Sequence, residues 1–151
     1  MLAAVLSAAV LGGCLGGDRA VASWELAPGQ SLGPESTTFT ALVTRVSCNN
    51  GVTGSVNEPG LGIGDDAVVV TFTVSPGRPE SASCPGNDAV PYVVTLPEPL
   101  GTRSLVDGAC ESVAVAGSAT CASGAVRRQR ASGRRRSTPR PVHGASTSTR
   151  S

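Results

Sequence analysis

The sequence predicts an all-β fold: a small antiparallel sandwich or barrel stabilised by two disulfides, with a disordered N-terminal tether and a disordered C-terminal tail. Three observations support this prediction. Short segments rich in Val and Thr alternate with turns rich in Gly and Pro, no segment keeps helical spacing for more than two turns, and four of the five cysteines lie in the central part of the chain. With 151 residues there is room for one domain.

The β domain is expected over residues 37–121, beginning with an alternating strand. Residues 38–48 alternate apolar and polar side chains. The turn Asn49-Asn50-Gly51 that follows suits a tight hairpin, with a return strand through Val52 and Val56.

The later strands are predicted from residue type and from the turns between them. The strongest signal is AVVVTFTV at 67–74, because β-branched residues favour strands. Further strands are expected at 90–96, 104–106 and 112–116. The segment GLGIG at 60–64 lacks the spacing of a nucleotide-binding loop and precedes a strand instead of a helix, so it is interpreted as a flexible turn.

The first 13 residues carry no charge and are too few to span a bilayer, which needs roughly 20 apolar residues. Their length suits the apolar region of an export signal. The sequence Leu11-Gly12-Gly13-Cys14 resembles the lipobox of bacterial lipoproteins. That resemblance implies a signal peptide over 1–13, cleavage after Gly13 and lipidation of Cys14. An export signal normally begins with Lys or Arg, so the true start codon is expected upstream.

A rival cleavage site follows. Ala20-Val21-Ala22 fits the A-x-A pattern of ordinary secretion, and a cut after Ala22 would release a soluble β domain. Residues 14–36 are small, polar and broken by Gly and Pro, so they are predicted to be a flexible tether. Trp24 within them is expected to dock on its own domain, with a ligand anchor as the alternative.

Either cleavage leaves Cys48, Cys84, Cys110 and Cys121, an even number that predicts two disulfides in an exported chain. Three pairings are possible. Cys48 with Cys84 and Cys110 with Cys121 is favoured, because pairing neighbours requires the least topology. Zinc sites usually show close C-x2-C pairs, which are absent here.

The segments CPGN, VPYVVTLPEPLG and LVDGAC lie within residues 48–126. This stretch resembles a group of small exported proteins of high-GC Gram-positive bacteria without assigned activity. The resemblance implies a location in the cell envelope and supplies no mechanism.

The sequence offers no complete catalytic set, so no catalytic residue, cofactor or metal is predicted. A hydrolase triad needs a histidine, and His143 lies alone in the C-terminal tail. Asp65-Asp66 is a weak candidate for calcium and is better interpreted as a solvated turn. A carboxylate-dependent envelope hydrolase would need Glu98, Asp107 and Glu111 to converge. Asp107 is instead expected to brace a hairpin by pairing with Arg103.

Residues 122–151 are predicted to be a disordered, Arg-rich tail. Eight of the 12 arginines fall in 127–151, and all 11 acidic residues precede them. One interpretation is an out-of-frame extension of a GC-rich gene, with the frame shifting near Val126. Another is a basic arm for an anionic polymer or lipid of the envelope. Nucleic acid is not expected as a partner, since the tail lacks aromatic residues to stack on bases.

These features together predict an exported lipoprotein, attached through Cys14 to the outer face of the cell membrane, with a non-catalytic binding or structural role in the envelope. Two alternatives stay open. The first is a secreted domain cut after Ala22, and the second is the carboxylate hydrolase.

Overall fold

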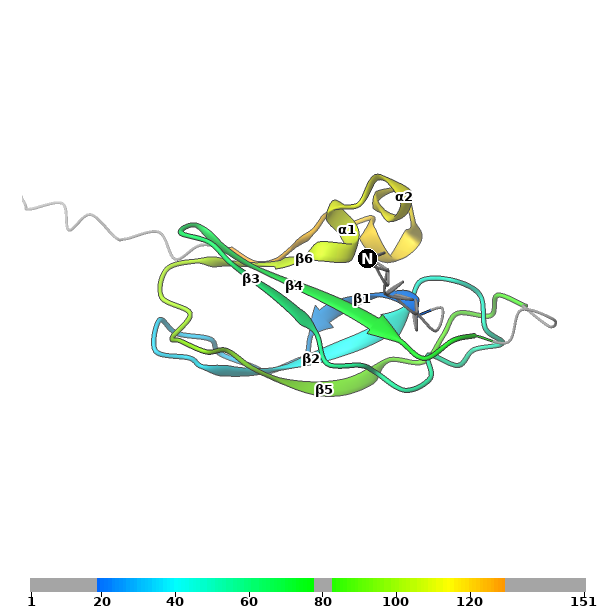
Figure 1. Ribbon diagram of the computed structural model, residues 1–151, viewed down its shortest axis with the longest axis horizontal. Coiled ribbons are helices and arrows are strands. Elements are labelled where there is room, and N and C mark those ends of the chain that lie inside the picture. Colours follow the sequence, from blue (N-terminus) through cyan, green and yellow to red (C-terminus); the bar gives the residue numbers. More distant parts are fainter. Residues whose placement is uncertain (1–18, 78–82, 130–151) are drawn as a thin grey trace, which may run out of the picture.

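The computed structural model describes residues 19–77 and 83–129, which are mostly β as predicted (Figure 1). The strands are β1 (Ala20–Leu26), β2 (Thr38–Arg45), β3 (Gly60–Ile63), β4 (Ala67–Val74), β5 (Val90–Thr95), β6 (Ser104–Asp107) and β7 (Val126–Arg128). Between β6 and β7 lie the one-turn helices α1 (Gly108–Glu111) and α2 (Val113–Ala116) and the 3-10 turn η2 (Ala119–Cys121). None of the helices in the described ranges is long and apolar enough to cross a membrane.

The seven strands form one mixed sheet in the order β5-β2-β1-β4-β6-β7, and β3 pairs with β4 outside this path. The C-terminal half of β4 pairs with β1, while its N-terminal half pairs with β3 and β6. The sheet therefore folds over along β4, so that β2 and β5 lie below β3, β4 and β6 (Figure 1). One pair departs from the expected antiparallel arrangement: β6 runs parallel to β4, because the chain crosses to β5 before it returns.

The core lies between these two layers and is built around aromatic rings. Trp24 lies 5.4 Å from Phe39 and 6.3 Å from Phe72 between ring centroids, and Phe72 lies 5.4 Å from Tyr92. The inward valines of β4 are fully buried around them. Trp24 is 1% exposed and so docks on its own domain, as expected.

The predicted tether is wrong for residues 20–26, which form β1 in the middle of the sheet. Ala22 and Trp24 point into the core, and β1 pairs with β2 on one side and β4 on the other. The Gly and Pro residues on either side of this strand indicated a loop. The strand forms because two partner strands, distant in sequence, pair with it and bury it. The domain therefore includes Ala20–Leu26 ahead of the start predicted at residue 37.

Three smaller predictions also need correction. The return strand after the Asn49 turn is reduced to a single bridge between Val56 and Val74. Residues 60–63 are strand β3, which pairs antiparallel with β4. Residues 112–116 form the start and body of α2 instead of a strand, within a segment that a disulfide closes into a compact loop.

The boundary predicted at residue 121 is also wrong, since β7 at 126–128 pairs with β6 and belongs to the domain. The predicted signal peptide, Cys14 and the part of the Arg-rich tail from 130 onward, including His143, lie outside the described residues.

Candidate functional site

Both predicted disulfides are confirmed. Cys48 and Cys84 join the loop after β2 to the loop before β5, with their Cα atoms 4.8 Å apart. Cys110 and Cys121 join α1 to η2, with a Cα separation of 5.4 Å. In the described ranges there is no group of three or more His, Cys, Asp or Glu side chains that could hold a metal ion.

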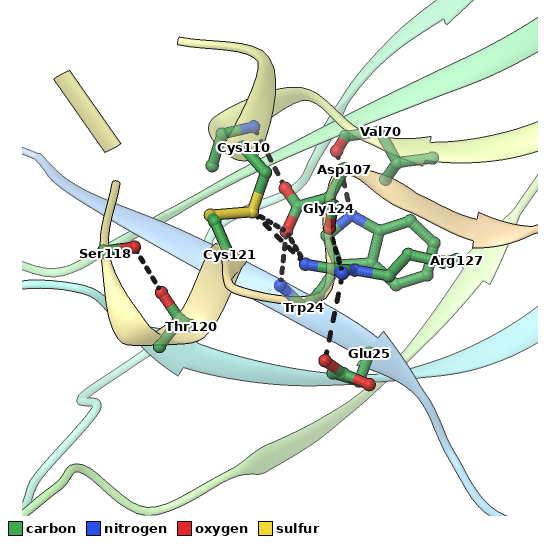
Figure 2. Close-up of a disulfide and its surroundings, with 11 residues drawn as sticks. Trp24, Glu25, Val70, Asp107, Cys110, Ser118, Thr120, Cys121, Gly124 and Arg127 are labelled. Atoms are coloured by element: carbon green, nitrogen blue, oxygen red, sulfur yellow. Dashed lines mark hydrogen bonds and ion pairs between the residues drawn. A yellow bond between two sulfur atoms is a disulfide. The ribbon is translucent and has the colours of Figure 1, made fainter. Parts of the chain in front are cut away.

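A buried ion pair lies beside the second disulfide (Figure 2). Asp107, the last residue of β6, is fully buried. Its Oδ2 accepts hydrogen bonds from the Trp24 amide at 2.9 Å and from Arg127 Nη2 at 2.8 Å. Its Oδ1 accepts from the Ala109 amide at 3.0 Å and so caps α1. This cap turns the chain from strand into helix directly after β6.

Arg127 reaches this carboxylate from β7. Its side chain is 3% exposed, and Nη1 also donates to the Gly124 carbonyl at 2.8 Å. Its Nη2 lies 3.3 Å from Cys110 Sγ. The guanidinium Nε is buried and has no hydrogen-bond partner among the described residues. Through these contacts Arg127 joins its own strand, β7, to the end of β6 and to the Cys110–Cys121 disulfide.

Burial raises the pKa of Asp107 above its ordinary value, and hydrogen bonds from Trp24, Arg127 and Ala109 oppose this rise. The carboxylate is closed off from solvent by the groups that bind it. Its chemistry is therefore that of a structural ion pair, because a substrate could reach it only by displacing one of these partners.

The three carboxylates considered for hydrolysis do not share a cleft. Glu98 is exposed and pairs with Arg103 before β6 begins, whereas Asp107 ends β6 roughly 10 Å further along the strand. Glu111 is exposed on α1. The predicted Arg103 and Asp107 pair is wrong for the same reason: the two residues lie at opposite ends of β6.

Asp65 and Asp66 lie exposed in the turn between β3 and β4. The Asp66 carbonyl accepts a hydrogen bond from the Ser104 amide at 2.9 Å, which joins this turn to the start of β6. The pair is thus in a solvent-facing turn, as the sequence indicated.

A second buried cation lies at the end of β2. Arg45, the last residue of β2, is 2% exposed. It donates from Nε to the Thr53 carbonyl at 3.2 Å and from Nη2 to the Ser75 carbonyl. It makes no ion pair with any described carboxylate. Arg45 therefore holds together the loops that follow β2 and β4.

Two cavities open near Arg45. The first, about 390 Å³, is lined by Asn49, Asn50, Val52, Gly54, Ser75 and Pro76. The second, about 320 Å³, lies between the Cys48–Cys84 disulfide and η2. Their described linings present amides, hydroxyls and short apolar groups, and the second cavity is also lined by Arg45 and by the Cys48–Cys84 disulfide. Amide and hydroxyl groups of this kind can form hydrogen bonds with a bound molecule.

Sequence reasoning missed Arg45 and Arg127 as buried groups. Nothing in the pattern around Arg127 marks it, since its partner lies 20 residues earlier. A signal for α1 does exist in the sequence, because Asp107 directly before Gly-Ala-Cys-Glu is a typical helix N-cap.

Comparison with known proteins gives no relative: no protein-family model, curated protein or solved structure matches this chain.

Proposed function

We propose that this protein is exported, carries lipid on Cys14 at the outer face of the cell membrane, and uses its β domain for binding or scaffolding in the cell envelope. The proposal includes no catalysis. Three features support it, and the second is the strongest argument for it.

The first feature is the two disulfides. Paired cysteines persist in oxidising compartments outside the cytoplasm. Four cysteines closed into two bridges leave Cys14 as the odd one, in the position that the lipobox resemblance assigns to lipid.

The second feature is strand β1. The entire pairing between β1 and β4 is made by Ala20, Val21 and Ala22. A cut after Ala22 would remove all three residues and leave the edge of β4 without its partner. A cut after Gly13 keeps the whole strand. The fold is therefore compatible with cleavage after Gly13, whereas cleavage after Ala22 would remove part of the central strand β1.

The third feature is the separation of the carboxylates. Glu98 and Glu111 lie apart, and Asp107 is closed off by Arg127. The two larger cavities of the described residues lie near Arg45 and offer hydrogen-bonding groups, and a smaller one of about 190 Å³ is lined by Glu58 and Tyr92. Binding is the role that such surfaces support.

The test is expression in a high-GC Gram-positive host with labelled palmitate. We expect label in the protein, loss of label in Cys14→Ser, and an unprocessed lipid-bearing precursor under globomycin. Mass spectrometry of the mature N-terminus supplies the control. A soluble, unlabelled product that begins at Ser23 would overturn the proposal.

A further inference from the structure

Strand β5 has one free edge, in the lower layer of the sheet (Figure 1). Among the described residues it lies at one end of the strand order and pairs with β2 alone. The other edge strands are shorter, with three residues in β7 and four in β3, whereas β5 has six residues and no charged side chain. An uncharged edge strand with unused backbone groups is a template on which another extended chain can pair.

The register shows which backbone groups of β5 are unused. The Leu96 amide donates to the Thr37 carbonyl at 2.7 Å, so the even-numbered residues of β5 direct their N–H and C=O groups toward β2. The odd-numbered residues Pro91, Val93 and Thr95 therefore direct theirs toward the free side. No hydrogen bond between described residues uses the Val93 or Thr95 amide.

Two prolines limit the free edge to a short stretch. Pro91 lies two residues before Val93, and Pro97 lies two residues after Thr95. Proline has no N–H to donate to a neighbouring strand. The edge therefore offers the outward N–H groups of Val93 and Thr95 and is closed on both sides of them. Such an edge resists open-ended stacking of strands but can accept one short extended segment.

A cavity of about 190 Å³ lies beside the same stretch. It is lined by Glu58, Pro59 and Leu61, in and just before β3, and by residues 92–95 of β5. Val93 is 65% exposed on the other face of β5. Side chains alternate between the two faces along an added strand as well, so every second one would point toward this cavity. The cavity is smaller than the roughly 300–1,000 Å³ of small-molecule sites, and this size suits a single aliphatic side chain.

The charge of the described residues favours a basic segment on this edge. They include nine Asp and Glu residues and five arginines, a net charge of −4, and residues 78–82 add one residue of each sign. Glu58 lines the cavity, is exposed, and forms no ion pair with a described arginine. A basic side chain two residues from the aliphatic one would share its face and approach Glu58. A second copy of the domain would instead bring like charges together.

We propose that the free edge of β5 binds one short extended peptide, which adds a strand beside Val93 and Thr95. An aliphatic side chain of this peptide enters the cavity, and a basic side chain on the same face pairs with Glu58. The inference rests on the binding role proposed above and deepens it, because it names the site and the class of ligand: an exposed, basic segment of another protein.

The experiment uses residues 14–151 with Cys14→Ser, which retain every described residue and carry no free thiol once both disulfides are closed. Fluorescence anisotropy measures binding of the labelled peptide Ser-Arg-Thr-Val-Thr-Ser, and of the same peptide in reverse order, up to millimolar concentration. N-methylation of the threonine between arginine and valine blocks the amide that faces β5. N-methylation of the valine blocks an amide that faces away and is the matched control.

We expect saturable binding that methylation of the threonine weakens at least about tenfold and methylation of the valine leaves unchanged. In the protein, Val93→Pro removes one outward N–H and should weaken binding about 3–10-fold. Pro91 shows that β5 accommodates proline at such a position. Val93→Thr keeps the N–H and should bind as the parent chain does. Glu58→Gln should weaken binding about 2–5-fold at low salt.

Three results would overturn the inference: no binding of either peptide, equal binding of the two methylated forms, or a concentration-dependent dimer that Val93→Pro abolishes. Equal urea midpoints confirm that the variants fold, and the methylated peptides test the site without any change to the protein. Because no step uses lipid, failure of this experiment is distinct from failure of the lipid anchor, which the palmitate experiment decides.

Discussion

Replacing Arg127 by Met is the sharpest test of what holds the C-terminal part of the fold. The substitution keeps most of the buried alkyl stem and removes the guanidinium. Asp107 would then remain fully buried with its two backbone donors, Trp24 and Ala109, and without a positive partner.

The cost follows from these contacts. Removing one partner of a buried ion pair costs about 3–5 kcal/mol, because the other charge is left uncompensated. The Arg127 bond to the Gly124 carbonyl adds about 1 kcal/mol. Asp107 can relieve part of the penalty by taking up a proton, since burial already raises its pKa. We therefore expect a loss of about 3–4 kcal/mol at neutral pH, a large share of the 5–15 kcal/mol typical of a domain.

The assay is urea unfolding followed by the fluorescence of Trp24, whose amide donates to Asp107. The matched control is Arg128→Met on the same strand. Arg128 donates to the carbonyls of Arg103 and Leu32 and pairs with no carboxylate among the described residues, so its loss should cost about 1 kcal/mol. Asp107→Asn completes a double-mutant cycle, with a coupling energy on the order of 1.5–3 kcal/mol.

One result would refute this reasoning. If Arg127→Met costs no more than Arg128→Met, the ion pair contributes nothing beyond ordinary hydrogen bonds. A coupling energy near zero in the cycle would lead to the same conclusion.

Three further predictions concern the same core. Folding raises the pKa of Asp107, so its contribution to the unfolding free energy is complete below the ordinary pKa of 3.8 and is lost as pH rises through the pKa in the folded state. The unfolding free energies of wild type and Asp107→Asn, measured across this pH range, should therefore differ by an amount that changes with pH. Two curves that run parallel would contradict this prediction. Gly108→Ala should cost about 1–3 kcal/mol in urea unfolding, since its methyl group would meet the Thr71 hydroxyl, and a neutral effect would count against the close packing of α1 on β4. A chain beginning at Ser23 should show broadened, destabilised unfolding relative to one beginning at Arg19, and equal midpoints would remove the structural argument against the rival cleavage.

The sequence predicted those strands whose own residues alternate in polarity or are rich in β-branched side chains. Residues 38–45 were predicted from their alternation and residues 67–74 from their β-branched side chains, and the structure buries alternate side chains in both strands. β1 and β7 escaped prediction for a physical reason. β7 has three residues, and the seven residues of β1 form a strand through pairing with partners distant in sequence, which local composition does not encode.

The Asp107–Arg127 ion pair could not be predicted either, because it also depends on strand pairing between residues distant in sequence. Asp107 and Arg127 become partners only through the register of β6 with β7, and that register contains an irregularity between Leu105 and Val106. Arg103 looked the better partner because it lies close in sequence, but a strand separates neighbours by about 3.3 Å per residue. The disulfides were predictable because neighbour pairing of cysteines needs no such register.

The incorporation of β7 changes how the Arg-rich region should be interpreted. Arg127 neutralises a buried carboxylate, and Arg128 joins β7 to the loops around Leu32 and Arg103. These two arginines are therefore committed to the fold and are not available to a polyanion. An out-of-frame origin no longer accounts for them, because it would place a guanidinium against Asp107 only by chance. Both interpretations of the tail now apply only to the sequence after Gln129.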